Sequence, residues 1–212
     1  PTLAPYAKSG EVMLRVTARV GRDENADEIL QPMMDKVEEV AGEFIYGIDI
    51  GDLQTAAVTR LKEKGLHVAT AESCTGGYIS KRITEVDGAS SVFDCGVCSY
   101  ANEIKEKVLG VSHETLMNYG AVSEQCAREM AAGIRRLSGA EIGISTTGIA
   151  GPGGGTPTKP VGLVYVAVDS DKYSEVLKLN IPSRSDDARE YIRYIASSNA
   201  LHLIWKAAGF FD

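Results

Sequence analysis

Apolar and polar residues follow two different periods in the first fifty residues of the chain. Residues 11–20 alternate between apolar and polar or basic side chains, which is the pattern of a half-buried strand. Apolar residues then recur at helical spacing after Asn25 or Asp27, either of which can cap a helix, and Gly42 follows its end. Residues 44–46 predict a second short strand. Residues 1–50 therefore predict a small α+β domain of β-α-β order, with too few residues for much of a core.

A change of composition at residues 47–52 marks a domain boundary, and residues 51–212 form the second predicted domain. Asp52 can cap a helix that runs to Lys64, with Gly65 as its stop. Strand and helix patterns then alternate along residues 66–71, 76–86, 95–100, 102–109, 124–137, 141–147, 161–168, 175–181 and 185–208. Helices interleaved with short β-branched strands predict an α/β protein, a three-layer α/β/α sandwich with a largely parallel sheet.

Composition narrows the class of protein. The chain is 44% hydrophobic and 24% charged, which is ordinary for a globular protein. It contains neither an apolar stretch of about 18 residues nor a secretory signal, so we expect a cytoplasmic protein without a membrane segment. The net charge of −7 argues against general nucleic-acid binding but admits a small anionic substrate. The chain begins with Pro1 rather than Met, and we expect it to be part of a longer protein.

Cysteine spacing does not predict a metal site. Cys95 and Cys98 have the spacing of zinc ligands, but neither a second such pair nor a nearby histidine completes a set of four. We therefore expect buried free thiols and no metal ion.

The first candidate site is the segment TAESCTGG at residues 70–77, where an apolar strand turns into a helix. A helix beginning near Thr75 would direct its free N–H groups and the positive end of its dipole toward Ser73, favouring an anion or a developing oxyanion. Ser73 is a candidate nucleophile in this tight turn, although the chain lacks the GxSxG elbow. The alternative is that Ser73 only caps the helix.

A second candidate site is the loop that follows the strand pattern at residues 141–147. Five of the eight residues from Gly148 to Gly155 are glycine, which lets backbone approach a ligand closely. The alternative is a flexible surface loop. Because both loops begin at the carboxyl ends of strands, where α/β sheets bind ligands, we expect them to share one crevice.

Four longer motifs carry a family resemblance. They are AESCTGG at residues 71–77, SYANEIK at 99–105, YGAVSE at 119–124, and TGIAGPGGG at 147–155 with KPVG at 159–162. In order and spacing they resemble the CinA C-terminal domain family over residues 52–208. Residues 1–50 are similar to the small KH-like linker domain that precedes this region in full-length CinA proteins. The resemblance implies a homo-oligomer and, in the full-length protein, an N-terminal molybdopterin-binding-like domain.

The resemblance implies hydrolysis of the carboxamide of nicotinamide mononucleotide, which gives nicotinate mononucleotide and ammonia without metal or cofactor. Such a reaction requires a nucleophile, a base, donors for the oxyanion and a proton for the departing ammonia. Ser73 is the candidate nucleophile. No motif contains a histidine, so Tyr100 and Lys105 are the remaining catalytic candidates. A lysine acts as a base only when its pKa is lowered, and the alternative for Lys105 is a solvated helix residue.

Hydroxyl groups, backbone N–H groups and one guanidinium are the candidates for binding the substrate's phosphate or the oxyanion. These residues are Thr75, Gly76, Gly77, Thr147, Gly148, Gly151 and Arg189. Arg189 and Arg193 match the family's basic pair, but a salt-bridged helix face with Asp186, Asp187 or Glu190 is an open alternative. Glu72 would hinder phosphate binding unless its side chain points away from Ser73, as strand alternation predicts.

Two other classes of function remain as alternatives. The first is a non-catalytic nucleotide-binding, regulatory or scaffold module of a competence- or DNA-damage-associated protein. The second is RNA binding by the KH-like domain, which needs a GxxG loop. Residues 21–24 read GRDE, so the second glycine is missing and two acids stand where a phosphate would lie. We therefore expect a linker domain without nucleic-acid binding.

Overall fold

The computed structural model describes residues 1–182 and 187–211. The chain forms two compact units, Pro1–Ile50 and Gly51–Asp212. Among the described residues, no helix is both long enough and apolar enough to cross a membrane.

The first unit has the order β-β-α rather than the predicted β-α-β. Strands β1 (Thr2–Lys8) and β2 (Glu11–Thr17) form an antiparallel hairpin, and helix α1 (Ala26–Ala41) follows with Asn25 as its cap. Sequence analysis missed β1 because Pro5 and the small residues around it are typical of a connector, yet an edge strand tolerates proline. The predicted strand at 44–46 is wrong, since a 3₁₀ turn (Gly42–Phe44) occupies its start.

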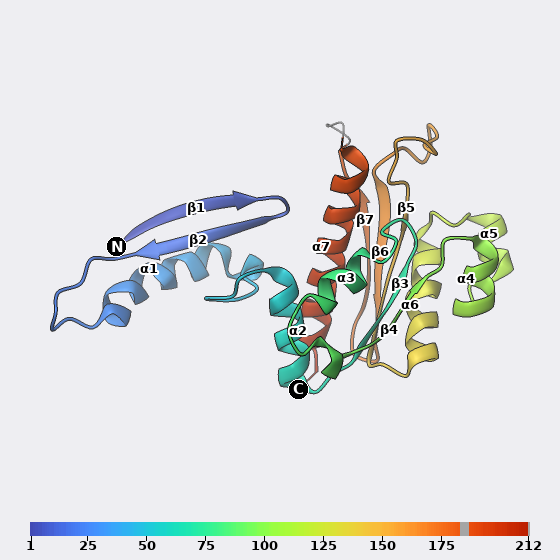
Figure 1. Cartoon of the computed structure of the whole chain (residues 1–212). Helices are drawn as coiled ribbons and strands as arrows, with labels where there is room; N and C mark the ends of the chain where they lie inside the picture. Colours follow the sequence, from blue (N-terminus) through green and yellow to red (C-terminus); the bar gives the residue numbers. More distant parts are fainter. Residues whose placement is uncertain (183–186, 212) are drawn as a thin grey trace. The chain divides into compact units, whose positions relative to one another are not determined.

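The second unit is a five-stranded sheet with helices on both faces, which confirms the predicted α/β/α sandwich (Figure 1). The strand order is β4-β3-β5-β6-β7. Strands β4, β3 and β5 are parallel, whereas β5, β6 and β7 pair antiparallel, so the sheet is mixed. The strands are β3 (Val68–Glu72), β4 (Phe93–Cys98), β5 (Ile142–Gly148), β6 (Leu163–Asp169) and β7 (Ser174–Asn180).

The departure from a largely parallel sheet has a simple cause. A parallel pair needs a crossover, usually a helix, but the glycine loop after β5 contains no helix and returns the chain as antiparallel β6. Residues 170–173 then form a tight turn into β7.

Helices α2, α3 and α7 lie on one face of the sheet, and α6 lies on the other with α4 and α5 outside it (Figure 1). Asp52 caps α2 and Gly65 ends it in a left-handed conformation, as predicted. The six residues of α5 are too few to give a helical period, so it was missed. The predicted helix start at residue 185 lies outside the described residues. The helices are α2 (Leu53–Lys64), α3 (Tyr78–Thr84), α4 (Asn102–Leu109), α5 (His113–Asn118), α6 (Glu124–Ser138) and α7 (Ala188–Ala208), with a 3₁₀ turn η2 (Ala89–Ser91).

Helix α4 packs very closely on α6 because of one glycine. A Cβ added at Gly133 of α6 would lie 1.9 Å from the carbonyl oxygen of Leu109, the last residue of α4. Any larger residue would push α4 outward. Gly133 therefore sets the position of the helix that carries Lys105.

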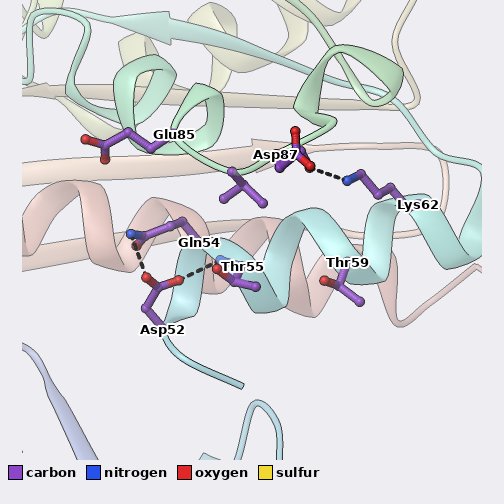
Figure 2. Close-up of a pocket in the computed structure, with 8 residues that line it drawn as sticks. Asp52, Gln54, Thr55, Thr59, Lys62, Glu85 and Asp87 are labelled. Carbon is purple, nitrogen blue, oxygen red and sulfur yellow. Dashed lines mark hydrogen bonds between the residues drawn. The ribbon is translucent and has the colours of Figure 1, made fainter. Parts of the chain in front are cut away.

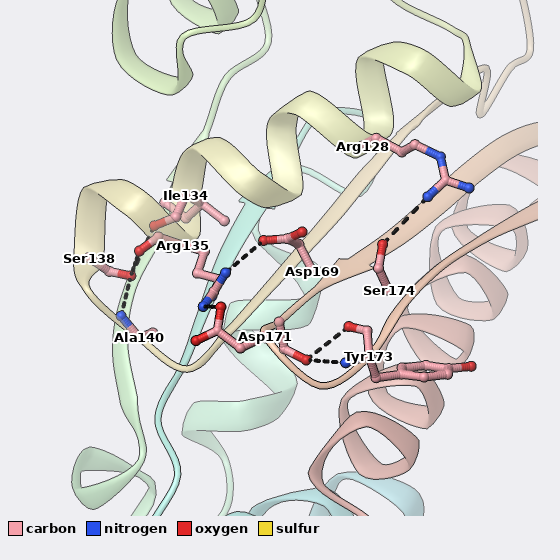
Figure 3. A network of polar contacts seen from close by, with 10 residues as sticks. Arg128, Ile134, Arg135, Ser138, Ala140, Asp169, Asp171, Tyr173 and Ser174 are labelled. Carbon is pink, nitrogen blue, oxygen red and sulfur yellow. Dashed lines mark hydrogen bonds and ion pairs between the residues drawn. The ribbon is translucent and has the colours of Figure 1, made fainter. Parts of the chain in front are cut away.

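A polar network fastens α6 to the turn between β6 and β7 (Figure 3). Arg135 of α6 pairs with Asp169 at 3.3 Å and also with Asp171. Within the turn, Ser170 Oγ accepts a hydrogen bond from Tyr173 N at 2.9 Å. These contacts hold the β6–β7 turn against the helix layer.

Candidate active site

Three parallel strands end at the same edge of the sheet and bring the predicted loops together. Glu72 at the end of β3 lies in register with Cys98 of β4 and Thr146 of β5. Ser73 N donates to Thr146 O at 3.0 Å, and Ser99 N donates to Glu72 O at 2.9 Å. The Ser73 turn therefore lies between the start of the glycine loop and the segment that contains Tyr100 and Lys105.

Lys105 is buried beside Ser73 rather than solvated on its helix. Only 1% of its surface is exposed. Its Nζ donates to Ser73 Oγ at 3.2 Å, to Ser99 O at 2.6 Å and to Tyr100 O at 3.4 Å. All three acceptors are neutral, and burial lowers the pKa of Lys105 below its usual value. The amine can therefore lose its proton more readily than an exposed lysine.

Cys74 sits next to Ser73 but is not suited to act as the nucleophile. Its thiol is buried, and burial raises its pKa to about 12. The thiolate, which is the nucleophilic form, is therefore scarce at neutral pH. Between the two adjacent side chains, Ser73 is the one in contact with a candidate base.

Tyr100 lies at the surface, with 63% of its area exposed. Its hydroxyl accepts a hydrogen bond from Arg189 Nη2 at 3.2 Å, while Arg189 Nη1 donates to Gly151 O. Arg189 thus bridges Tyr100, two residues before α4, and Gly151 of the glycine loop. The structure places Tyr100 at the surface, where its hydroxyl contacts Arg189.

The carboxylate of Glu72 occupies the N-terminus of α3, where the sequence predicted a bound anion. This buried carboxylate accepts N–H bonds from Gly77 at 2.9 Å, Ile79 at 3.1 Å and Ser80 at 2.9 Å. Helix α3 begins at Tyr78 and not near Thr75, and the N–H groups of Gly77, Ile79 and Ser80 at its start already donate to Glu72. Gly77 occupies the cap position, so the alternative that Ser73 caps the helix is also wrong.

The predicted donors around Ser73 are engaged with the protein itself. Thr75 Oγ1 and Thr146 Oγ1 are both buried and lie 2.6 Å apart. Gly76 N donates to Ser73 O at 3.2 Å, and Thr147 Oγ1 donates to Ala121 O at 2.6 Å. These groups shape the turn and its neighbouring strand.

The predicted loop glycines also have structural roles. A Cβ at Gly148 would lie 2.6 Å from Leu163 O, so glycine there permits the close approach of β5 and β6. Gly151 has a positive φ of 79°, and its carbonyl accepts from Arg189. Of the predicted binding residues, Arg189 has an exposed charged group beside the glycine loop.

Sequence reasoning missed Thr146, Ser99 and the contact of Arg193 with the Ser73 turn. Arg193 donates from Nε and Nη2 to Thr75 O at 3.1 and 2.7 Å. Ser99 supplies the shortest acceptor to Lys105, and its own buried Oγ has no partner among the described residues. These contacts depend on strand register and backbone oxygens, for which the residue types give no signal. Arg193 also pairs with Glu190 at 3.2 Å, whereas Asp186 lies outside the described residues.

A separate pocket of about 720 Å³ lies between α2 and the segment that follows α3 (Figure 2). Asp52 caps α2 there, and Lys62 Nζ donates to Asp87 O at 2.6 Å. None of its lining residues belongs to the Ser73 site. Within the described part of the chain, no group of three or more His, Cys, Asp or Glu side chains suits a metal ion.

Two family sequence models match the chain. The CinA C-terminal domain matches residues 51–208, and the damage-inducible protein CinA KH domain matches residues 1–47. The chain is 47% identical over 207 residues to a CinA-like protein of Kosmotoga olearia, covering 98% of this chain and 49% of that protein. It is 48% identical over 206 residues to a putative competence-damage inducible protein of Caldicellulosiruptor saccharolyticus, covering 97% and 49%. The chain thus spans about half the length of these curated relatives.

Solved structures agree with the sequence matches. The competence/damage inducible protein CihA of Agrobacterium tumefaciens is similar with a TM-score of 0.69 and 40% identity, covering 77% of this chain and 99% of that one. A CinA superfamily protein of Klebsiella pneumoniae has a TM-score of 0.69 and 32% identity, covering 74% and 96%. Since the two family models together account for nearly all of the residues, the chain belongs to the CinA family and consists of its KH domain followed by its C-terminal domain.

Proposed function

We propose that this chain is a serine amidase that converts nicotinamide mononucleotide to nicotinate mononucleotide and ammonia, with Ser73 as nucleophile and Lys105 as general base. The observation that carries the proposal is the buried Lys105 amine, 3.2 Å from Ser73 Oγ and surrounded by neutral oxygens. This distance is within the reach of a general base. A lysine without a neighbouring carboxylate to hold its proton is suited to that role.

The reaction proceeds in two halves. Ser73 Oγ attacks the carboxamide carbon while Lys105 Nζ accepts the hydroxyl proton, so that a C–O bond forms and the carbonyl electron pair moves to oxygen. The C–N bond then breaks, and the Lys105 ammonium gives the proton to the departing nitrogen, which leaves as ammonia. Water attacks the resulting ester while Lys105 accepts its proton. Release of the carboxylic acid then returns that proton to Ser73.

Positive charge near the glycine loop supports an anionic substrate. Arg189 is exposed, and its hydrogen-bond partners among the described residues, Gly151 O and Tyr100 Oη, are neutral. Lys159 likewise donates to a backbone oxygen, Tyr119 O, at 2.6 Å. A guanidinium binds phosphate with a fork of N–H groups, so Arg189 is our candidate for the substrate phosphate.

The test is incubation of the purified protein with nicotinamide mononucleotide, following ammonia and nicotinate mononucleotide. We expect turnover by the wild type and its loss in Ser73→Ala and Lys105→Ala. Lys107→Ala is the matched control, because Lys107 is an exposed lysine on the same helix and should keep full activity.

The alternative is a nucleotide-sensing module that has the same site without the chemistry. Binding of nicotinamide mononucleotide by calorimetry without any turnover by the wild type would support it and overturn the amidase. Equal activity of Lys105→Ala and wild type would leave the enzyme but remove Lys105 as its base.

A further inference from the structure

The two arginines of helix α7 have different surroundings, although the sequence presents them as one basic pair. Arg189 is exposed, and its hydrogen bonds join Tyr100 to Gly151 of the glycine loop. Arg193, one turn later, is turned toward the Ser73 turn and is only half-buried. Two residues of the same type on one helix therefore meet different parts of the site.

We propose that Arg193 is a positioning residue that holds the Ser73 turn in its reactive geometry and does not bind the substrate's phosphate. This inference rests on the proposed role of Ser73 as nucleophile. Arg193 reaches Ser73 through the backbone of Thr75, two residues further along the chain.

The Ser73 turn is fastened on two sides. On the strand side, Ser73 N donates to Thr146 O, and Thr75 Oγ1 bonds Thr146 Oγ1 at 2.6 Å. On the helix side, the carbonyl of Thr75 receives two N–H groups from Arg193. Gly76 and Gly77 follow with positive φ values of 59° and 93°, so the turn continues through residues of wide conformational freedom. Without Arg193, the Thr75 carbonyl loses both of these N–H donors, and the turn keeps its strand-side bonds and the bond from Gly77 N to the Glu72 carboxylate.

The guanidinium of Arg193 is occupied in a way that leaves little for a ligand. Its Nε and Nη2 donate to Thr75 O, and its Nη1 pairs with Glu190 at 3.2 Å. Its central carbon also lies 5.4 Å from the centre of the Tyr78 ring. A phosphate bound here would have to compete with Glu190 and release Thr75 O. Arg189 also donates to a backbone oxygen, Gly151 O, but its partners among the described residues include no carboxylate with which a phosphate would have to compete.

Kinetics on two substrates separate the two roles. Nicotinamide riboside has the same carboxamide as the mononucleotide but lacks the phosphate. If Arg193 positions Ser73, Arg193→Lys lowers kcat on both substrates by the same factor, about 10- to 100-fold, with KM unchanged. If Arg193 binds the phosphate, the variant raises KM for the mononucleotide alone, and the inference is wrong. Arg189→Lys is the matched comparison, for which we expect a raised KM for the mononucleotide alone.

A measurement that needs no turnover distinguishes this inference from the function itself. Phenylmethylsulfonyl fluoride, which carries no phosphate, sulfonylates reactive serines with loss of fluoride, and peptide mass spectrometry locates the label at Ser73. We expect Arg193→Lys and Arg193→Gln to slow labelling at least 10-fold relative to wild type, at unchanged thermal midpoint. Labelling at the wild-type rate in a folded variant overturns the positioning role. A wild type that neither turns over nor takes the label overturns the proposed function instead.

Discussion

The parallel and antiparallel halves of the sheet hold a positive side chain in opposite ways: Lys105 is buried, whereas Arg135 is partly exposed. In the parallel half, formed by β4, β3 and β5, Lys105 lies against three neutral oxygens. In the antiparallel half, formed by β5, β6 and β7, Arg135 is held by Asp169 and Asp171. Arg135, paired with two carboxylates, stays charged and fastens the scaffold. Lys105 has no carboxylate partner among the described residues, so burial destabilises its charged form and it can exchange a proton. Chemistry and stability are thus assigned to different halves.

Replacement of Lys105 should give the largest effect and should separate activity from stability. We expect Lys105→Met to lower turnover by about 10³-fold or more, because the base is lost. The same change should leave the free energy of unfolding unchanged or raise it, because a buried ammonium is replaced by an apolar side chain of similar length. Chemical denaturation beside the ammonia assay checks both. A strongly destabilised variant would show that Lys105 is a structural residue.

Gly133→Ala should lower both activity and stability, since it disturbs the packing that positions Lys105. Its Cβ would meet Leu109 O at 1.9 Å, so α4 must shift away from α6. We expect a loss of about 1–3 kcal/mol in the free energy of unfolding, together with lower kcat. The control is Gly139→Ala: this glycine has no atom within 4 Å of an added Cβ, although its positive φ adds strain. It should cost stability while kcat stays at the wild-type value.

Removal of Arg135 should affect only the scaffold. Its ion pairs are partly exposed, so we expect Arg135→Ala to lower the free energy of unfolding by about 1 kcal/mol, with kcat unchanged. Arg128→Ala removes an exposed pair with Glu124 on the same helix and should cost about 0.3–0.5 kcal/mol. Urea unfolding of both variants measures the difference. A fall in kcat for Arg135→Ala would mean that the two halves are coupled.

The pH dependence of Lys105 should give the smallest but most specific signal. Its folded-state pKa lies below the unfolded value, so between the two the unfolded chain binds more protons and stability rises with pH. Below the folded-state pKa both states are protonated and this rise is absent. Activity should increase over the same range as the free amine forms. Lys105→Met should lose the stabilising rise, whereas an identical pH profile of stability in both proteins would contradict the lowered pKa.

The sequence predicted much of the second unit because its signals are local. Asp52 and Gly65 bound α2 by ordinary capping chemistry, and α4 begins and ends at the predicted residues. The antiparallel half was not anticipated, because a glycine-rich connection does not show on which side of β5 the chain returns. In the first unit, β1 depends on pairing with β2 across the hairpin, with Pro5 opposite Leu14.

Candidate residues were easier to find than their contacts. Ser73 and Lys105 are separated by many residues, and it was the family motifs that predicted both as parts of one site. The structure places them side by side. The Glu72 carboxylate points toward α3 because of the way the end of β3 meets that helix. Arg193 reaches Thr75 O because of the way the face of α7 meets the same strand end. Residue types alone carry no such information, since a glutamate at a strand end can point toward a ligand or cap a helix.

The register of β3 with its neighbours sets which length changes the domain tolerates. Ser73 N reaches Thr146 O because Glu72 lies opposite Thr146, so a residue inserted or deleted within β5 would move the glycine loop along the nucleophile turn by a full residue spacing. The turn at residues 170–173 lies at the far edge of the same sheet. A length change at that turn leaves the β3–β5 register unchanged, although it disturbs the pair of Arg135 with Asp171, whereas β3 and β5 must keep their lengths.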